Sequence, residues 1–123
     1  MKSSKRTIVP IVCAVVLIGE RGREEITAKV DTGASRTSVD TDLAAKVGLG
    51  PVTDTVKVRA ASSAQVEVRP LVQARIQLEG RAFELPVSIT DRADMKYPVI
   101  IGMDILTEGN FLIDVSSRTL NGE

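Results

Sequence analysis

Apolar and polar residues alternate along much of this chain with a period of two. The longest run covers residues 83–90, in which Phe83, Leu85, Val87 and Ile89 occupy every second position. Shorter runs of the same kind occur at residues 26–30 and 74–78. Successive side chains of a strand point to opposite faces of a sheet, so this period predicts strands with one buried face.

Two further alternating segments, residues 56–59 and 66–69, flank the small and polar residues 60–65. This arrangement predicts a β-hairpin that stands away from the body of the domain. Helix is expected only in two short pieces. One runs from Asp40 to Val47 and stops at Gly48, and the other follows Gly102 and ends near Gly109. The chain therefore reads as a mostly β domain.

The order strand, glycine turn, strand, loop and short helix occurs twice, starting near residue 16 and again near residue 76. Sequence identity between the two copies is slight, but the shared order suggests two related units. Before the first copy, Lys2, Lys5 and Arg6 precede an apolar stretch at residues 8–18. We expect a buried first strand there. A short signal peptide is the alternative, although no small-residue cleavage pattern follows.

The 123 residues fit one compact domain, 1–123, with 43% hydrophobic and 26% charged residues. Aromatic residues make up only 2%, and sixteen basic residues balance sixteen acidic ones. The chain therefore has few aromatic side chains on which nucleic-acid bases could stack, and no excess of basic residues to bind phosphates. Neither nucleic acid nor a membrane is expected as a partner. A single cysteine, Cys13, excludes an internal disulfide and suits a cytoplasmic location; we expect it to be a small buried hydrophobe.

The absence of histidine narrows the chemistry. Neither a Ser-His-Asp nor a Cys-His nucleophilic site can be built within this chain. A zinc site normally draws on His and Cys, so no metal and no cofactor is expected. Carboxylate chemistry that needs no metal is what the composition allows.

The triplet Asp31-Thr32-Gly33 closes one of the alternating strands and is followed by the small residues Ala34 and Ser35. An aspartate at a strand end, on a turn that glycine permits, can expose its carboxylate while the backbone behind it stays hydrogen-bonded. A turn-capping role for Asp31 is the structural alternative. The Asp31 carboxylate is the candidate catalytic group.

A second motif, residues 97–102, runs from Tyr97-Pro98 through three branched apolar residues into Gly102. It predicts a fully buried strand that ends where another backbone passes close by.

Together the two motifs resemble the retropepsin-like aspartic proteases, in which an Asp-Thr/Ser-Gly-Ala loop is followed by a flap hairpin and a late apolar-apolar-Gly motif. The resemblance covers about residues 15–115, and it implies a role for each matching position. Asp31 is the catalytic residue, supported by Thr32, Gly33 and Ala34; Ala61, Ser62, Ser63 and Ala64 form the flap tip; and Ile100, Ile101 and Gly102 form the late structural motif.

Within that family the chain is most similar to the prokaryotic branch known as ATP-dependent zinc proteases. The matching stretches are residues 28–34, 69–72, 91–92 with Met95, 97–98 and 111–114. The zinc of that name finds no support in a chain without histidine. Retropepsins often pair an arginine after the late glycine with an acidic residue after the triplet, but here those places hold Met103 and Ser35. Arg36 and Asp104 are candidates for a reversed pair.

The resemblance implies an aspartic endopeptidase with the retropepsin half-barrel fold. The reaction needs two carboxylates, one ionised and one protonated, and this chain has one such triplet. We therefore expect a symmetric homodimer with an Asp31/Asp31′ dyad, acting on peptides or proteins. Residues 8–12 and 111–115 are candidate strands for an intersubunit sheet.

The alternative function is a catalytically weak or inactive peptide-binding or dimerisation module. A small secreted β-barrel binding protein is a second alternative. Four arginines, Arg36, Arg59, Arg69 and Arg92, are expected to be ordinary surface charges. The less favoured interpretation is that they border the cleft and select acidic peptides.

Overall fold

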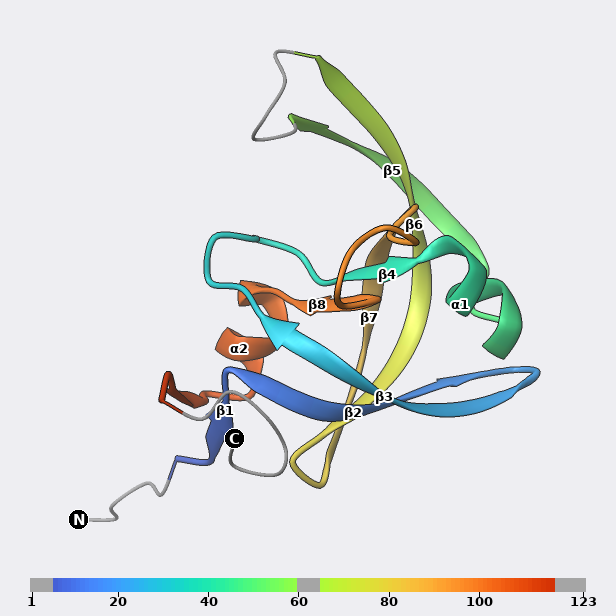
Figure 1. Ribbon diagram of the computed structural model, residues 1–123. Helices are drawn as coiled ribbons and strands as arrows, with labels where there is room; N and C mark the ends of the chain where they lie inside the picture. Colours follow the sequence, from blue (N-terminus) through green and yellow to red (C-terminus); the bar gives the residue numbers. More distant parts are fainter. Residues whose placement is uncertain (1–5, 60–64, 117–123) are drawn as a thin grey trace.

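The computed structural model describes residues 6–59 and 65–116, in which β-strands dominate (Figure 1). The strands are β1 Ile8–Pro10, β2 Val12–Gly19, β3 Gly22–Val30, β4 Ser38–Asp40, β5 Val52–Arg59, β6 Val66–Leu78, β7 Arg81–Thr90, β8 Val99–Ile101 and β9 Leu112–Asp114. The helices are α1 Thr41–Val47 and α2 Met103–Glu108. The expected mostly β architecture with two short helices is confirmed.

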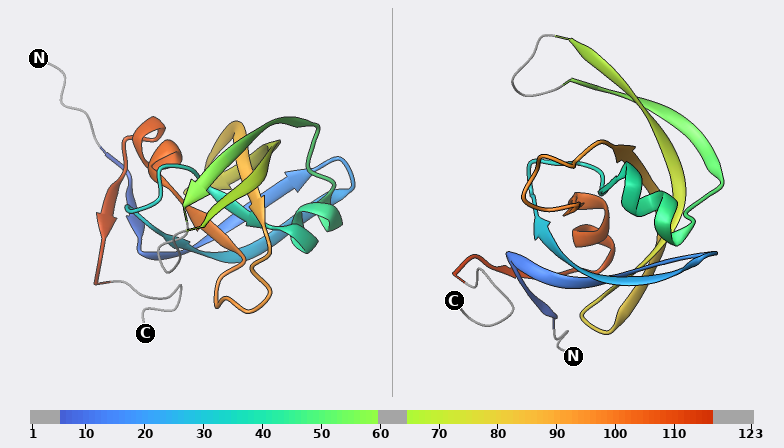
Figure 2. Two further views of the ribbon diagram at one scale, coloured as in Figure 1. Left: turned by 90° about the horizontal axis from the view of Figure 1, so that it is seen from above. Right: turned by 45° about the vertical axis from the view of Figure 1, so that its right-hand side comes forward.

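Seven strands form one sheet in the order β2-β3-β8-β4-β7-β6-β5. An additional antiparallel pairing joins β2 to β6, with Val15 opposite Leu78 and Ile18 opposite Arg75, so the sheet curls back on itself. Figure 2 shows this curled body from two further sides. This is the half-barrel that the sequence predicted.

The alternating runs place their apolar members in the core. Phe83, Leu85, Val87 and Ile89 of β7 are all buried, and so are the apolar residues of the 74–78 run in β6. The core is almost entirely aliphatic, as the composition requires. Cys13 belongs to it, since its side chain is fully buried and burial raises the pKa of its thiol to about 12. The thiol is therefore uncharged at neutral pH, as expected of a small hydrophobe.

Each helix begins and ends as its flanking residues indicate. Asp40 caps α1 by accepting hydrogen bonds from the backbone N–H groups of Asp42 and Leu43. Gly48 ends the helix in the left-handed region at φ 75°, a conformation that glycine adopts without a Cβ penalty. Helix α2 starts directly after Gly102 and ends at Gly109.

The two copies of the repeated order meet at the centre of the sheet. Strand β3 runs parallel to β8, and β7 runs parallel to β4 in the same relation, while β4 and β8 are antiparallel. The first copy comprises β3, β4 and α1, and the second comprises β7, β8 and α2. If β3 is exchanged with β7 and β4 with β8, the same three pairings result, so the two copies occupy equivalent positions in the sheet. The order of elements expected from the sequence is present, and it gives the domain an internal pseudo-two-fold arrangement.

Strands β5 and β6 extend from this body as a long hairpin, seen at the top of Figure 1. Their antiparallel register pairs Val56 with Arg69 and Arg59 with Val66. The hairpin predicted from residues 56–59 and 66–69 is thus confirmed. Its tip, including the predicted flap residues Ala61–Ala64, lies outside the described residues.

The two terminal segments pair with each other within one chain. Strand β1 is parallel to β9, with Ile8 opposite Leu112, and together they form a separate two-stranded sheet. The rest of the N-terminal apolar stretch forms β2, which is largely buried. Both strands that were expected to contribute to an intersubunit sheet do form. In this structure they pair with each other within one chain.

A buried threonine joins three elements behind the loop that carries Asp31. The Thr37 hydroxyl donates to Asp104 Oδ1 (2.7 Å) and accepts from the Gly102 N–H (3.1 Å). Its backbone N–H donates to Asp104 Oδ2 (2.9 Å), and its carbonyl accepts from the Ser88 N–H (3.0 Å). Thr37 is completely buried, so each of these groups depends on its protein partner. We call this set of contacts the Thr37 junction.

Replacing Thr37 with valine removes the hydroxyl but keeps the shape of the side chain. The buried Gly102 N–H would then lose its partner, and Asp104 Oδ1 would keep only the hydrogen bond from the Ile105 N–H. We expect the free energy of unfolding to fall by about 1–3 kcal/mol. Chemical denaturation would measure this loss. Thr27→Val, at an exposed position of β3, is the matched control and should change stability by less than about 0.5 kcal/mol.

Candidate active site

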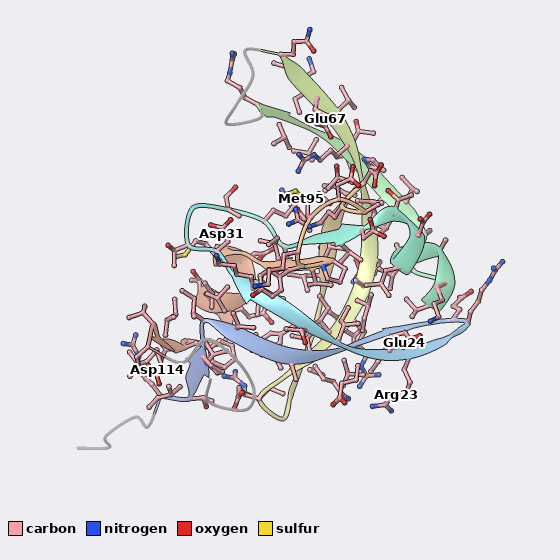
Figure 3. The ribbon with its side chains drawn as sticks, viewed as in Figure 1. Arg23, Glu24, Asp31, Glu67, Met95 and Asp114 are labelled. Carbon is pink, nitrogen blue, oxygen red and sulfur yellow. The ribbon has the colours of Figure 1, made fainter. Side chains whose placement is uncertain are left out.

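Asp31 follows β3 directly and lies on an exposed loop below the hairpin (Figure 3). Its backbone N–H donates to the Ile101 carbonyl (2.9 Å), which continues the β3–β8 ladder to the last residue before the loop turns. Its Oδ1 accepts from the Gly33 N–H (2.9 Å). The backbone of Asp31 is therefore held by β8, and this second hydrogen bond restricts the rotation of its carboxylate.

The rest of the loop is fastened to the start of α2. The Ala34 N–H donates to the Asp31 carbonyl (3.1 Å), and the Met103 N–H donates to the Ala34 carbonyl (2.8 Å). A Cβ on Gly102 would lie 2.6 Å from the Arg36 carbonyl carbon and 2.9 Å from the Ala34 oxygen, so only glycine fits. This confirms the expectation that the late strand ends where another backbone passes close by.

Two cavities flank the loop. The first, of about 340 Å³, lies between the loop and the hairpin, and Gly33, Ala34 and Arg36 face Val56 and Arg69 across it. The second, of about 490 Å³, lies between Asp31 and the segment that follows β7. Its wall contains Lys29, Asp31, Thr32, Arg92, Met95, Lys96, Tyr97 and Ile100. Asp31 is the one carboxylate residue among the described residues that line either cavity.

Asp40 fastens the segment after β7 in much the same way as Asp104 fastens the Asp31 loop. Its Oδ1 accepts from the Arg92 N–H (2.7 Å), while Oδ2 accepts from the first turn of α1. Asp91 also repeats the geometry of Asp31, because its Oδ1 accepts from the N–H two residues later, in Ala93 (2.9 Å). The two loops are thus built alike, one in each half of the pseudo-two-fold arrangement.

The side chain of Arg92 is half-buried beside Asp31. Its Nε donates to the Tyr97 carbonyl (2.9 Å), and within the described residues its guanidinium group forms no salt bridge. Burial lowers the pKa of Arg92, the nearby Arg69 lowers it further, and Asp40 and Asp31 raise it. Arg92 and Asp31 are therefore close enough to interact electrostatically.

The sequence-predicted motifs meet in this structure, because Asp31–Ala34 lies against Ile100–Gly102. The suggested pair of Arg36 with Asp104 is wrong. In the structure the Asp104 carboxylate instead accepts from the Thr37 N–H and hydroxyl and from the Ile105 N–H. The roles of Thr37 and Asp40 were not predicted. No local pattern signals them, because the partners concerned lie 51 to 67 positions away in the chain.

Two other kinds of feature are absent from the described residues. No group of three or more Cys, Asp or Glu side chains there is arranged to hold a metal ion. No described helix has the length and apolar character needed to cross a membrane.

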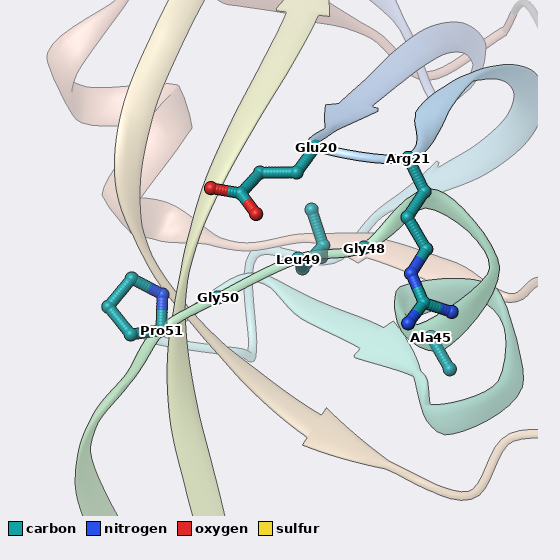
Figure 4. A pocket seen from close by; sticks show the side chains of 7 residues that line it. All are labelled: Glu20, Arg21, Ala45, Gly48, Leu49, Gly50 and Pro51. Carbon is teal, nitrogen blue, oxygen red and sulfur yellow. The ribbon is translucent and has the colours of Figure 1, made fainter.

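A separate cavity of about 440 Å³ lies where the β2–β3 turn packs on the end of α1 (Figure 4). The Arg21 N–H donates to the Val47 carbonyl there, and the Glu20 N–H donates to the Gly48 carbonyl. None of the predicted site residues lines this cavity, whose wall combines Glu20, Arg21 and Leu49 with small residues of the turn. We therefore take the two cavities beside Asp31 as the candidate site.

Solved structures with the same fold include two retroviral-type proteins. The EIAV protease, complexed with the inhibitor HBY-793, superposes with a TM-score of 0.65 at 15% identity, covering 85% of this chain and 91% of that one. The retroviral protease-like domain of Ddi1 from Leishmania major gives a TM-score of 0.56 at 19% identity, covering 92% and 86%. A Legionella pneumophila protein of unknown function, Lpg0085, gives 0.66 at 20% identity, covering 94% and 98%.

At these identities the likeness establishes the fold, which is that of the retropepsins. No curated protein matches the chain in sequence. The sequence pattern of the aspartyl protease family does match, over residues 15–105, which include both the Asp31 loop and the Ile100–Gly102 motif. The chain therefore belongs to the aspartyl protease family.

Proposed function

We propose that two copies of this chain form an aspartic endopeptidase whose dyad consists of one Asp31 from each copy. The observation that carries the proposal is the setting of Asp31. Its exposed carboxylate sits on a loop whose backbone is fixed by β8 and α2. Asp31 lines one of the two cavities that flank this loop, and neither cavity contains a second carboxylate residue among the described residues. One chain thus offers half of the required pair.

The chemistry defines what the second half must supply. An ionised carboxylate takes a proton from the attacking water while a protonated one donates to the carbonyl oxygen of the substrate. Two carboxylates about 3 Å apart share one proton, because both cannot ionise together. A two-fold axis next to Asp31 meets this requirement with two identical groups. The hydrogen bond from Gly33 to Oδ1 would keep each carboxylate in a fixed orientation.

Exposed apolar residues mark the surface on which the copies would meet. Ile8 is 58% exposed, Leu112 is 44% exposed and Met103, at the start of α2, is 40% exposed. Ile8 and Leu112 belong to the two-stranded sheet of β1 and β9, which pairs with no other strand among the described residues. We infer that this sheet and Met103 form the dimer contact around the Asp31 loops.

The β5–β6 hairpin is the proposed flap, with Ala61, Ser62, Ser63 and Ala64 at its tip. Its arms already form one wall of the 340 Å³ cavity over Gly33 and Ala34. A peptide in extended conformation would lie between the two flaps and the dyad, held mainly through backbone hydrogen bonds. Thr32 and Gly33 support the dyad, and Gly33 leaves room for the substrate backbone.

The first test removes the acid–base group and keeps the loop. Asp31→Asn retains an oxygen that can accept from the Gly33 N–H, so the fold should persist while peptide cleavage falls by about 10³-fold or more. Asp91→Asn is the matched control, because Asp91 makes the same local hydrogen bond in the other loop. It should cleave as the wild type does, as measured by mass spectrometry of a peptide library. Equal activity of Asp31→Asn and wild type would refute the proposal.

A second test follows from the single carboxylate per chain. Specific activity should fall on dilution below the dimer dissociation constant, which analytical ultracentrifugation would measure on the same samples. Equilibrating wild type with excess Asp31→Asn should also suppress activity, because a heterodimer carries only one carboxylate able to ionise. Constant specific activity at concentrations where the protein sediments as a monomer would show that one chain holds a complete site.

The same two proteins, wild type and Asp31→Asn, also distinguish an active enzyme from an inactive peptide-binding module. A transition-state mimic of the pepstatin type should bind the wild type more tightly than it binds Asp31→Asn if the dyad is functional. Equal binding to both, without cleavage of any library peptide, would favour the inactive module.

A further inference from the structure

The cavity between Asp31 and the segment after β7 has a strongly uneven charge. Its wall contains three cationic residues, Lys29, Arg92 and Lys96, against the single carboxylate of Asp31. Lys96 is exposed and its ammonium lies 5.6 Å from the centre of the Tyr97 ring, and Lys29 is exposed at the end of β3. A side chain bound in this cavity would therefore meet a net positive wall directly beside the proposed catalytic group.

Arg92 is the member of this group with a fixed position. Its backbone N–H is held by Asp40 (2.7 Å) and its Nε by the Tyr97 carbonyl (2.9 Å), so the side chain is tethered at both ends. In the described part of the chain, the two outer guanidinium nitrogens make no hydrogen bond. A tethered guanidinium loses little conformational entropy when it binds a carboxylate, and its geometry suits two parallel hydrogen bonds.

Among the described residues, no carboxylate forms a salt bridge with the Arg92 guanidinium, although Asp40 and Asp31 lie close enough to raise its pKa. Asp40 already accepts three backbone N–H bonds, from Arg92, Asp42 and Leu43. Arg69 also acts on Arg92 as a like charge, and is itself paired with Glu67 (3.1 Å). A half-buried cation without an ion-pair partner carries a desolvation cost that a ligand carboxylate would offset.

The cavity under the hairpin is also lined by cationic residues, namely Arg36, Lys57, Arg59 and Arg69. Lys57 and Arg59 are exposed, and Arg69 is paired with Glu67 (3.1 Å). The cavity beside Asp31 differs from it because its cationic residues share one wall with the proposed catalytic carboxylate.

We propose that this cavity is a subsite for a glutamate or aspartate side chain of the substrate, and that Arg92 is the specificity-determining residue that binds its carboxylate. The proposal rests on the proposed function, and the two-fold dimer extends it. Because each copy presents the same cavity next to its own Asp31, the enzyme should select acidic residues on both sides of the cleaved bond.

The test uses the full chain and synthetic peptides that differ only at the two residues flanking the cleaved bond, Glu-Glu against Gln-Gln. The wild type should cleave the Glu-Glu peptide with a kcat/KM about 10- to 100-fold higher, the range expected for charge-assisted hydrogen bonds. Arg92→Gln should lose most of this preference. Arg92→Lys keeps the positive charge but loses the planar guanidinium that can form two parallel hydrogen bonds, so it should retain an intermediate preference.

Arg23→Gln is the matched control, because Arg23 is an exposed arginine of β3 far from Asp31 (Figure 3). It should keep the wild-type preference. Thermal denaturation of each variant would show whether Arg92→Gln, which loses the bond to Tyr97, still folds. If Arg92→Gln does not fold, the test rests on Arg92→Lys, whose preference for the Glu-Glu peptide should be weaker than that of the wild type. A folded Arg92 variant with the full wild-type preference, or a wild type that does not distinguish the two peptides, would overturn the subsite.

Binding provides a readout that does not depend on turnover. In Asp31→Asn, calorimetry should show tighter binding of the Glu-Glu peptide than of the Gln-Gln peptide, and adding Arg92→Gln should remove the difference. Acid-selective binding in a wild type that cleaves nothing would refute the protease and retain the subsite. Cleavage without acid selectivity would refute the subsite and retain the protease.

Discussion

The Thr37 junction is the constraint on which the candidate site depends. One buried residue joins the loop of Asp31 to the end of β8, the start of α2 and the backbone of β7 through four hydrogen bonds. Gly102 lets the two backbones approach closely enough for these bonds to form. An exposed loop of seven residues would otherwise be free to adopt many conformations. Held in this way, it can present the Asp31 carboxylate in one orientation.

The pseudo-two-fold arrangement explains why the second loop resembles the first. The carboxylate at the start of each helix fastens the loop of the other half: Asp104 binds Thr37, and Asp40 binds the Arg92 N–H. Between them, the Ser38 and Ser88 hydroxyls meet at 2.6 Å where β4 pairs with β7. The loops differ in what they carry. Both expose an aspartate, but a glycine follows two residues after Asp31, whereas the tethered Arg92 follows directly after Asp91.

The sequence was informative wherever the physics is local. Alternation placed Phe83 to Ile89 in the core, Gly48 and Gly102 marked real boundaries, and Asp31 was located at the end of its strand. Long-range polar contacts were not predictable. Asp40 looked like an ordinary helix start, although one of its oxygens holds a loop 52 residues away, and Asp104 bonded to Thr37 instead of Arg36. Such pairs depend on how closely backbones approach, which no residue pattern encodes.

In the proposed dimer, the charges around the site would affect assembly as well as specificity. Bringing two Asp31 carboxylates together is unfavourable unless they share a proton. Each copy also brings Lys29, Arg92 and Lys96 into the same region, so the cations offset part of that repulsion. After the dyad has formed, they still outnumber its single remaining negative charge. An acidic peptide would then bind most favourably, because its carboxylates would neutralise the remaining positive charge. The same residues would thus connect formation of the dyad with the choice of substrate.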